Sequence, residues 1–477
     1  MERTNDEGGS KKLGLFLLVM LIVGSIIGSG IFNSPTDLIN KANPLATIIA
    51  WLVGGFGVLM LVLMFQMLST KKPELKGGIY SYAKAGFGDY VGFNSAWGYW
   101  LSAFLGNVAF ITMVFKTLNS MLGDKHQLSS FATFLLGSIL LWVYHLIITR
   151  GIKQATVLNA VITIAKFVPL ILVIVFGIAV FSSGTFTVQN WMSNLASTGE
   201  STSLGAQINN AMGTILWCFF GVEAAVVMSN RAKSSKLVGK STVISFLIVL
   251  VLYMLISIIS MGVVPAKQLA GSATPLADVL SKTFLGSAGS VIVHLGILIS
   301  ILGALVSWLM LTAEVPYIAS KDGVMPKWFS KENHAGVPIN SLIFSNGITQ
   351  LFLLFLLIPQ LQTAYSAAYT LATTAILVPY LFSALYALKI TITEKLNAGC
   401  LAISVLATLY SVYVIYAVGL KYLAAAVILY AIGGIPFYFA RREKSQSLSR
   451  NERIALGIIV MIALAMIVMI ATGVIQL

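Results

Sequence analysis

The sequence has few charges, cysteines or histidines, and each of these shortages excludes a class of protein. Charged residues make up 10% of the 477 residues, whereas soluble proteins carry roughly 25%. The two cysteines, Cys218 and Cys400, lie far apart in apolar stretches and form neither a metal-binding nor a redox spacing. The four histidines show no metal spacing, and no nucleophile motif is present. We therefore expect no cofactor, no bound metal and no enzymatic activity.

Hydrophobic residues, by contrast, are abundant. They make up 58% of the chain, and the mean hydropathy is +0.91. Apolar runs of roughly 18 residues or more recur from end to end, and each is long enough to cross the hydrocarbon core of a bilayer, which is about 30 Å thick. The polar start, MERTNDEGGSKK, is followed by no short hydrophobic region with a cleavage site, so we expect the first run to be a retained helix. The sequence predicts an all-α integral membrane protein.

The apolar runs predict thirteen transmembrane spans, and no linker between them is long enough to separate soluble domains. Their expected bounds are 14–38, 45–70, 91–118, 129–149, 152–181, 207–230, 239–264, 285–319, 339–359, 363–388, 396–418, 420–440 and 453–476. Only Gly419 separates the eleventh run from the twelfth, but residues 396–440 are too many for a single crossing.

Lysine and arginine concentrate in alternate connectors between these spans. Of the 30 basic residues, 23 fall on one side and six on the other, and Lys166 lies inside a span. Because cytoplasmic loops carry the excess of basic residues, we expect a cytoplasmic N-terminus and, after thirteen spans, an extracellular C-terminus at the cell membrane. The net charge of +14 is thus a topology signal and does not indicate binding to nucleic acid.

The first span contains an unusual run of small residues. It reads GSIIGSGIFNSP over residues 24–35, which puts Gly28, Ser29 and Gly30 near the middle of the membrane. Glycines at this spacing have two interpretations. They form a packing face between many membrane helices, or they mark an unwound segment whose free N–H groups bind a carboxylate.

The sixth span, MGTILWCFFGVEAAVVMSNRAK, carries an acidic residue among apolar ones, at Glu223. A carboxylate at this depth costs about 2.5–3.5 kcal/mol or more, so it is expected to face protein or water and to mark a functional site. A structural bond to a neighbouring helix is the alternative. An interruption five spans after the first is typical of a five-plus-five inverted repeat in which both broken helices line one site.

Two more spans carry polar residues at depth. Lys166, in VITIAKFVPL, needs carbonyl or carboxylate partners unless it snorkels to the interface. In the eighth span, Trp308 and Glu314 repeat the six-residue spacing of Trp217 and Glu223. Six residues correspond to about 120° around a helix and about 9 Å along it, so the two members of each pair need not face one cavity. Near the cytoplasmic end, Glu314 also fits a solvated or salt-bridged role.

Together these segments resemble the amino acid–polyamine–organocation (APC) superfamily of transporters over nearly the whole chain. GSIIGSGIF is similar to the carboxylate-binding segment of that family, and FFGVEAA to its sixth-helix motif. KPELKGGIYSYAKAGFGDYVGFNSAWGYW, AEVPYIASKDGVMPKWF and ATTAILVPYLFSALYALK resemble basic amino acid/polyamine antiporters, most closely the arginine–ornithine branch. The resemblance implies an inverted-repeat fold with discontinuous first and sixth helices. Its expected parts are a cytoplasmic tail (1–13), a transport core (14–390) and accessory spans (391–477).

The resemblance also implies roles for single residues. The expected substrate-binding residues are Ser25, Ile26, Gly28, Ser29, Gly30, Trp217, Glu223 and Trp308, and the expected gating or coupling residues are Lys166, Trp217, Glu223 and Glu314. Amides of Ser29 and Gly30 would hold the substrate carboxylate, and the carbonyls of Ile26 and Trp217 its ammonium. Lys166 is similar to a lysine that replaces a sodium ion in some relatives and bridges the first and eighth helices. Arginine–agmatine exchangers lack this lysine and carry a neutral residue at the position of Glu314.

These features imply a sodium-independent antiporter that exchanges external arginine for internal ornithine by alternating access. Several alternatives stay open on the same scaffold: tyrosine/tyramine, histidine/histamine, lysine/cadaverine or agmatine/putrescine exchange, and proton-coupled symport. A channel would need a continuous lined pore, for which the sequence gives no sign. The expected partners are amino acids or amines and membrane lipids, with a homodimer left open.

Overall fold

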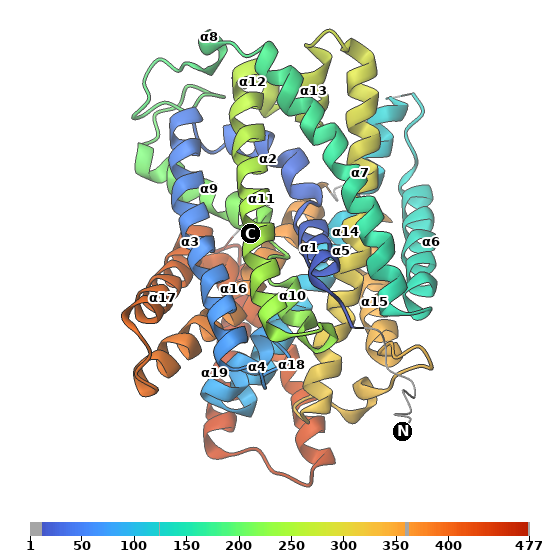
Figure 1. Ribbon diagram of the computed structural model, residues 1–477, viewed down its shortest axis with the longest axis vertical. Coiled ribbons are helices and arrows are strands. Elements are labelled where there is room, and N and C mark those ends of the chain that lie inside the picture. Colours follow the sequence, from blue (N-terminus) through green and yellow to red (C-terminus); the bar gives the residue numbers. More distant parts are fainter. Residues whose placement is uncertain (1–11, 124, 358–361, 476–477) are drawn as a thin grey trace, which may run out of the picture.

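The fold is a bundle of long helices that run along the length of the molecule (Figure 1). The computed structural model describes residues 12–123, 125–357 and 362–475. In these ranges the only β pairings are two isolated bridges, Leu13 with Ala232 and Asn194 with Ser201. The all-α prediction is therefore confirmed.

Eleven helical segments in the described ranges are long and apolar enough to cross a membrane. They are α1 (Leu15–Ile26) together with α2 (Ser29–Ile39), α3 (Pro44–Lys71), α5 (Asp89–Leu122), α6 (Ser130–Thr149), α7 (Ile152–Ala179), α11 (Ser235–Val263), α14 (Gly286–Lys321), α16 (Gln362–Thr393), α17 (Ala398–Val418), α18 (Leu420–Glu443) and α19 (Arg450–Ala471). The chain is a multi-pass membrane protein.

The other two expected spans, the sixth and the ninth, each consist of shorter helices in succession. The sixth consists of α9 (Leu204–Cys218), α10 (Ala224–Val227) and the 3-10 turn η1 (Met228–Arg231), and the ninth of α15 (Ile339–Leu353) and η3 (Leu354–Leu357). The remaining elements are the connecting helices α4 (Ile79–Phe87), α8 (Ser183–Phe186), α12 (Ala266–Ala270), α13 (Pro275–Ser281) and η2 (Lys327–Ser330). The thirteen expected spans thus each correspond to one observed helix or to two or three consecutive ones.

Local sequence explains where several helices begin and end. Asn43 caps α3 by accepting a hydrogen bond from the amide of Ala46, and Pro44 occupies the first helical position, where no amide donor is needed. Ser449 and Glu452 form a reciprocal capping box at the start of α19. Gly419 separates α17 from α18 with φ +108°, a conformation that favours glycine. The predicted division of residues 396–440 into two spans is confirmed.

Two of the spans are interrupted within the bundle. Ile27 and Gly28 separate α1 from α2, and residues 219–223 separate α9 from α10. The prediction of discontinuous first and sixth helices is confirmed. Of the two interpretations of the glycines in the first span, the unwound segment is the one observed, although Ser29 and Gly30 already belong to α2.

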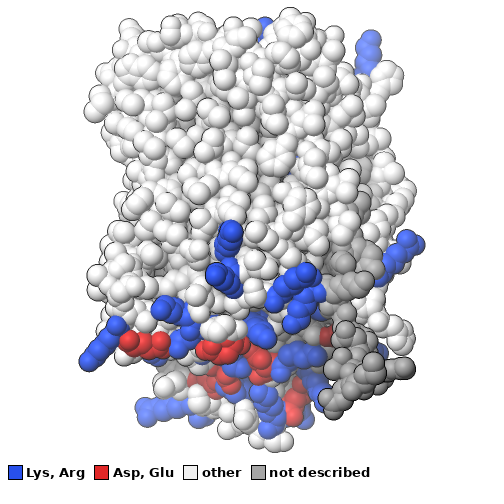
Figure 2. Space-filling model, viewed as in Figure 1, with Lys and Arg blue, Asp and Glu red and all other residues white. Residues whose placement is uncertain are grey.

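The helices differ greatly in burial. The central helix α5 is largely buried and packs against α14 and α16, whereas α19 lies at the periphery and exposes Met461, Leu464 and Val468. Such apolar exposure is expected for a helix in contact with lipid. On the face shown in Figure 2, charged side chains of both signs gather at the lower end, and the surface above them is almost free of charge.

Candidate functional site

The two interrupted spans are in close contact at a glycine from each span. Gly221 has φ +96°, and a Cβ atom built there would lie 2.6 Å from Ser25 Cβ and 2.9 Å from the Ser25 carbonyl carbon. A Cβ atom at Gly30 would lie 3.4 Å from Cys218 Cα. Glycine is thus required at Gly221 both by backbone conformation and by the close approach of α1. The sequence-predicted residues of the two spans are brought together at this crossing.

Buried donors satisfy the carbonyls at the end of α1. Lys166 Nζ, on α7, donates to Gly24 O at 2.8 Å and to Ile27 O at 2.7 Å. Ser300 Oγ, on α14, donates to the same Ile27 oxygen at 2.9 Å. Lys166 is fully buried and forms no ion pair with any described carboxylate. A fixed ammonium therefore compensates the carbonyl dipoles that the interruption exposes.

Two further carbonyls of α1 accept hydrogen bonds from side chains. Tyr253 OH, on α11, donates to Ile26 O at 2.8 Å, and Trp308 Nε1 donates to Ser25 O at 3.1 Å. The Ser25 hydroxyl donates back to Leu21 O at 2.7 Å. The Gly28 amide also donates to Ile26 O at 2.8 Å, so this oxygen accepts two hydrogen bonds, one for each lone pair. Tyr253 was not predictable as a site residue, because it lies in an apolar stretch of α11 that resembles many others.

The start of α2 has donors without a capping side chain. Gly28 precedes the helix with φ −112° and ψ −134°, and no side chain accepts from the first amides. The first N–H groups of a helix lack partners within that helix and carry partial positive charge. The N-terminus of α2, at Ser29 and Gly30, can therefore bind an anion such as a carboxylate.

Aromatic rings surround this crossing. Trp217 packs against Phe110 and Phe220 with centroid separations of 6.2 and 5.0 Å. Trp308 lies 6.4 Å from Tyr99, 6.4 Å from Phe110 and 6.0 Å from Phe220. Both tryptophans are buried. Such rings offer faces that attract a cationic group. Phe110, which joins the two tryptophans, was missed at the sequence level because α5 is rich in aromatics that pack elsewhere.

Glu223 is fully buried and has one neutral partner. Its Oε2 accepts a hydrogen bond of 2.6 Å from Tyr380 OH, on α16. Its Oε1 has no hydrogen-bond partner, and neither has the buried hydroxyl of Tyr99. A buried carboxylate that is only half satisfied is unfavourable for stability alone. Its retention in the fold favours a functional role.

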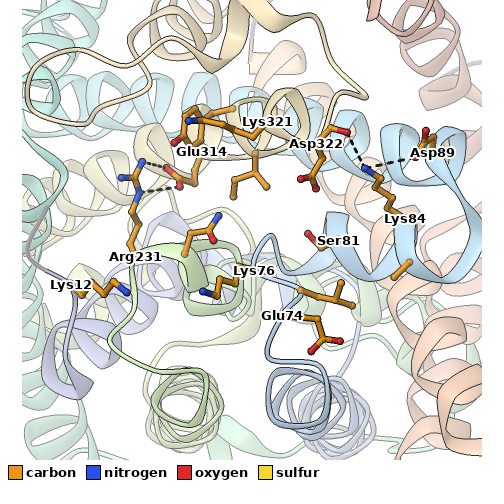
Figure 3. Close-up of a pocket in the computed structure, with 15 residues that line it drawn as sticks. Lys12, Glu74, Lys76, Ser81, Lys84, Asp89, Arg231, Glu314, Lys321 and Asp322 are labelled. Atoms are coloured by element: carbon orange, nitrogen blue, oxygen red, sulfur yellow. Dashed lines mark hydrogen bonds and ion pairs between the residues drawn. The ribbon is translucent and has the colours of Figure 1, made fainter. Parts of the chain in front are cut away.

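Glu314 has a different environment, shown in Figure 3. Its oxygens accept from Arg231 Nε at 3.1 Å and from Arg231 Nη2 at 3.3 Å, in a two-pronged ion pair between η1 and α14. The pair borders a cavity of about 780 Å³ with a mixed-charge lining that includes Lys76, Lys84 and Asp322. Of the two roles the sequence allowed, the salt-bridged one is observed. The structure does not bring Glu314 together with Glu223.

The described residues include no group of three or more histidine, cysteine, aspartate or glutamate side chains that could hold a metal ion. Cys218 is buried, Cys400 is half-buried, and neither forms a disulfide. The chemistry that the site offers is thus hydrogen bonding by main-chain groups, one ammonium, one carboxylate and aromatic faces.

Sequence comparisons place the chain among transport proteins. The profile described as "Amino acid permease" matches residues 13–464. The chain is similar to an arginine/ornithine antiporter of Pseudomonas aeruginosa, with 40% identity over 93% of this chain and 94% of the relative. It is also similar to an arginine/ornithine antiporter of Latilactobacillus sakei (37% identity, 96% of each chain) and an arginine/agmatine antiporter of Chlamydia felis (35% identity, 93% of each chain). Profile and relatives agree along nearly the whole length, and the chain therefore belongs to the amino acid permease family.

Proposed function

We propose that this protein is a sodium-independent antiporter that exchanges arginine for ornithine across the cell membrane by alternating access. The observation that carries the proposal is the contact of the two interrupted helices at Ser25 and Gly221. Interrupted helices expose main-chain donors and acceptors in one place, and a zwitterion needs both. The names of the relatives support the choice of arginine and ornithine.

The carboxylate and the ammonium of the substrate would bind to different main-chain groups, the carboxylate to amides and the ammonium to carbonyl oxygens. Its carboxylate would accept from the amides of Ser29 and Gly30 at the start of α2, and its ammonium would donate to Ile26 O and to the carbonyl of Trp217. This assignment is supported by the uncapped start of α2, whose first amides have no side-chain partner. Ile26 O already accepts from Tyr253 OH and from the Gly28 amide, so the ammonium would have to replace one of these donors. Trp217 and Trp308 would cover the cationic side chain, a contact worth about 0.5–2 kcal/mol for each ring.

Lys166 would take the place of a coupling ion. Its ammonium bonds Gly24 O and Ile27 O, which are the kind of unwound carbonyls that coordinate sodium in other transporters. A covalently attached cation at this point removes the need for a sodium ion to stabilise the broken helix. Exchange would then depend on the substrate of the opposite side and not on a sodium gradient.

Glu223 and the Arg231–Glu314 pair would form two layers of a gate. The Glu223–Tyr380 bond ties the sixth span to α16, and the ion pair ties η1 to α14 beside the large cavity. Opening toward that cavity would require both links to break. Because the basic connectors gather at this end, we propose that it faces the cytoplasm, with the N-terminus, and that the C-terminus is extracellular.

The packing of the C-terminal helices divides the chain into two parts. We propose that residues 14–390 form the transport core and that 391–477 form accessory spans, since both interruptions lie in the first part. In the second part, α17 packs against α3, α9 and α16, α18 against α5 and α16, and α19 against α18. Their exposed apolar faces would contact lipid or a second copy of the chain.

Proteoliposomes test the exchange directly. Purified protein is reconstituted, the vesicles are loaded with ornithine, and uptake of labelled arginine is measured in sodium-free buffer. Rapid uptake that requires internal ornithine is the expected result. Uptake into empty vesicles would indicate a channel or a symporter, and in that case imposed proton and sodium gradients identify the ion. Replacing ornithine by agmatine, putrescine, tyramine, histamine or cadaverine ranks the competing substrate pairs.

A further inference from the structure

A second cavity lies beside the loop that joins α2 to α3, away from the mixed-charge cavity. Its volume is about 340 Å³, within the range of roughly 300–1,000 Å³ that is usual for small-molecule sites. Its polar lining residues include Asn40, Lys41, Asn210, Thr370 and Tyr422. They come from four parts of the chain: the loop after α2, α9, α16 and the start of α18. Among the described residues of this lining, Lys41 is the single charged one.

Lys41 is held in place but keeps donors to spare. Its Nζ donates to Thr214 Oγ1, on α9, at 2.8 Å. An ammonium has three donors, so two remain for a ligand. Asp37 is close enough to act on Lys41 electrostatically, yet the two side chains form no ion pair in the described part of the chain. Burial lowers the pKa of Lys41, and Asp37 opposes this effect only in part, so the charge is incompletely compensated. An anion in the pocket would complete the compensation.

The pocket is built partly from the same two helices that carry the interruptions. Gly213, in its wall, is five residues before Cys218, where α9 ends, and five helical residues span about 8 Å. Lys41 follows the C-terminal end of α2, whose other end begins at Ser29. Two of the elements at the pocket, the end of α2 and α9, thus belong to the helices that converge at the contact of Gly30 with Cys218.

We propose that this pocket is an outer binding site that takes the carboxylate of an incoming amino acid on Lys41 before the molecule reaches the interrupted helices. The inference rests on the proposed exchange function and adds a selection step to it. An amine without a carboxylate has nothing to offer Lys41 and is repelled by it. The site would therefore favour amino acids over their decarboxylated products on this side of the membrane.

The test compares arginine with agmatine, which has the same guanidinium but no carboxylate. Membrane vesicles of uniform orientation, with the Lys41 side outward, are loaded with ornithine, and the KM for outer arginine and its inhibition by outer agmatine are measured. For Lys41→Met we expect the arginine KM to rise about tenfold or more, as for loss of one charge-assisted hydrogen bond. Agmatine inhibition should stay the same or strengthen. Lys41→Arg, and Lys267→Met on the exposed side of α12, should behave like the wild type.

A second variant keeps the test decisive if Lys41→Met fails to fold. Asn210 is an exposed residue of the pocket, and Asn210→Asp puts a negative charge opposite the expected carboxylate. It should weaken arginine and strengthen agmatine. An unchanged arginine KM in these variants, or equal weakening of both ligands, would overturn the outer site. If the wild-type protein itself shows no exchange, the proposed function fails first, and this outcome is distinct from the other two.

Discussion

Tyr380 donates a hydrogen bond of 2.6 Å to Glu223 and so links α16 to the segment that interrupts the sixth span. Both side chains are buried, and they are 157 residues apart in sequence. The other oxygen of Glu223 has no partner, although the buried hydroxyl of Tyr99 also lacks one. A carboxylate left half satisfied can exchange partners at low cost, which is what a moving gate requires.

Glu223→Gln should impair exchange while leaving the fold intact. The amide has nearly the same shape and can still accept from Tyr380, but it cannot carry the charge that we assign to the gate. We expect turnover to fall by at least about tenfold, equivalent to roughly 1.4 kcal/mol on the transport barrier. Counterflow in proteoliposomes and the melting temperature are the two measurements. Full transport by this variant would remove Glu223 from the site.

Tyr380→Phe should also slow exchange, because it removes the hydrogen-bond donor to Glu223. Loss of the hydroxyl leaves a buried carboxylate without any observed hydrogen bond, at a cost of about 1–3 kcal/mol. We expect slower exchange together with a lower melting temperature. Tyr416→Phe is the matched control, since that side chain is 67% exposed. Equal behaviour of the two phenylalanine variants would contradict a role for Tyr380.

Lys166→Ala should slow reorientation more than it weakens substrate binding. The variant leaves Gly24 O without its ammonium and removes one of two donors from Ile27 O. We expect turnover to fall about tenfold or more, and added sodium to restore part of it, because unwound carbonyls can coordinate that ion. Exposed Lys240→Ala is the control. Unchanged turnover would argue against the sodium-substitute role.

Gly221→Ala should destabilise the protein at the crossing itself. Its φ of +96° is unfavourable for alanine, and the added methyl group would meet Ser25. Strain of this kind costs on the order of 1–3 kcal/mol, before the clash is counted. Gly347→Ala, in the middle of α15 with nothing within 4 Å of the added carbon, should be neutral or stabilising. Thermal melting of the two variants in the same detergent makes the comparison. Similar melting temperatures would mean that the two segments do not touch.

A double-mutant cycle on Arg231 and Glu314 should reveal strong coupling. Arg231→Ala leaves a carboxylate that is 1% exposed without its partner, and the loss of one member of a buried pair costs about 3–5 kcal/mol. Glu314→Gln in the same chain should recover much of that loss, with a coupling energy of about 1–3 kcal/mol. Additive effects on the melting temperature would show that the pair is solvated and contributes little.

The sequence was sufficient for the spans because membrane burial imposes a strong local signal. Composition and run length predicted the thirteen spans but not the connecting helices α4, α8, α12 and α13, and the division at Gly419 followed from length alone. The interruption at Gly28 and the depth of Glu223 were also predictable, because small residues and a carboxylate are conspicuous in an apolar run. These are properties of the neighbouring sequence and need no knowledge of packing.

The partners of these residues were not predictable in the same way. Tyr253 lies 227 residues from Ile26, Ser300 lies 273 residues from Ile27, and Arg231 lies 83 residues from Glu314. Tyrosine and serine are common in membrane helices, and a basic residue at a span end looks like a topology signal. Only the packing of α11 and α14 against α1, and of α14 beside η1, selects these residues from many of the same type.

The shared acceptor at Ile27 has a mechanical consequence. One oxygen atom receives both the ammonium from α7 and the hydroxyl from α14, so three helices are pinned at a single point. If α1 tilts away from α7 and α14, both hydrogen bonds to Ile27 O must break, or both donor side chains must move with α1. Breaking both hydrogen bonds at once would leave this buried oxygen without a donor, which disfavours intermediate positions of α1.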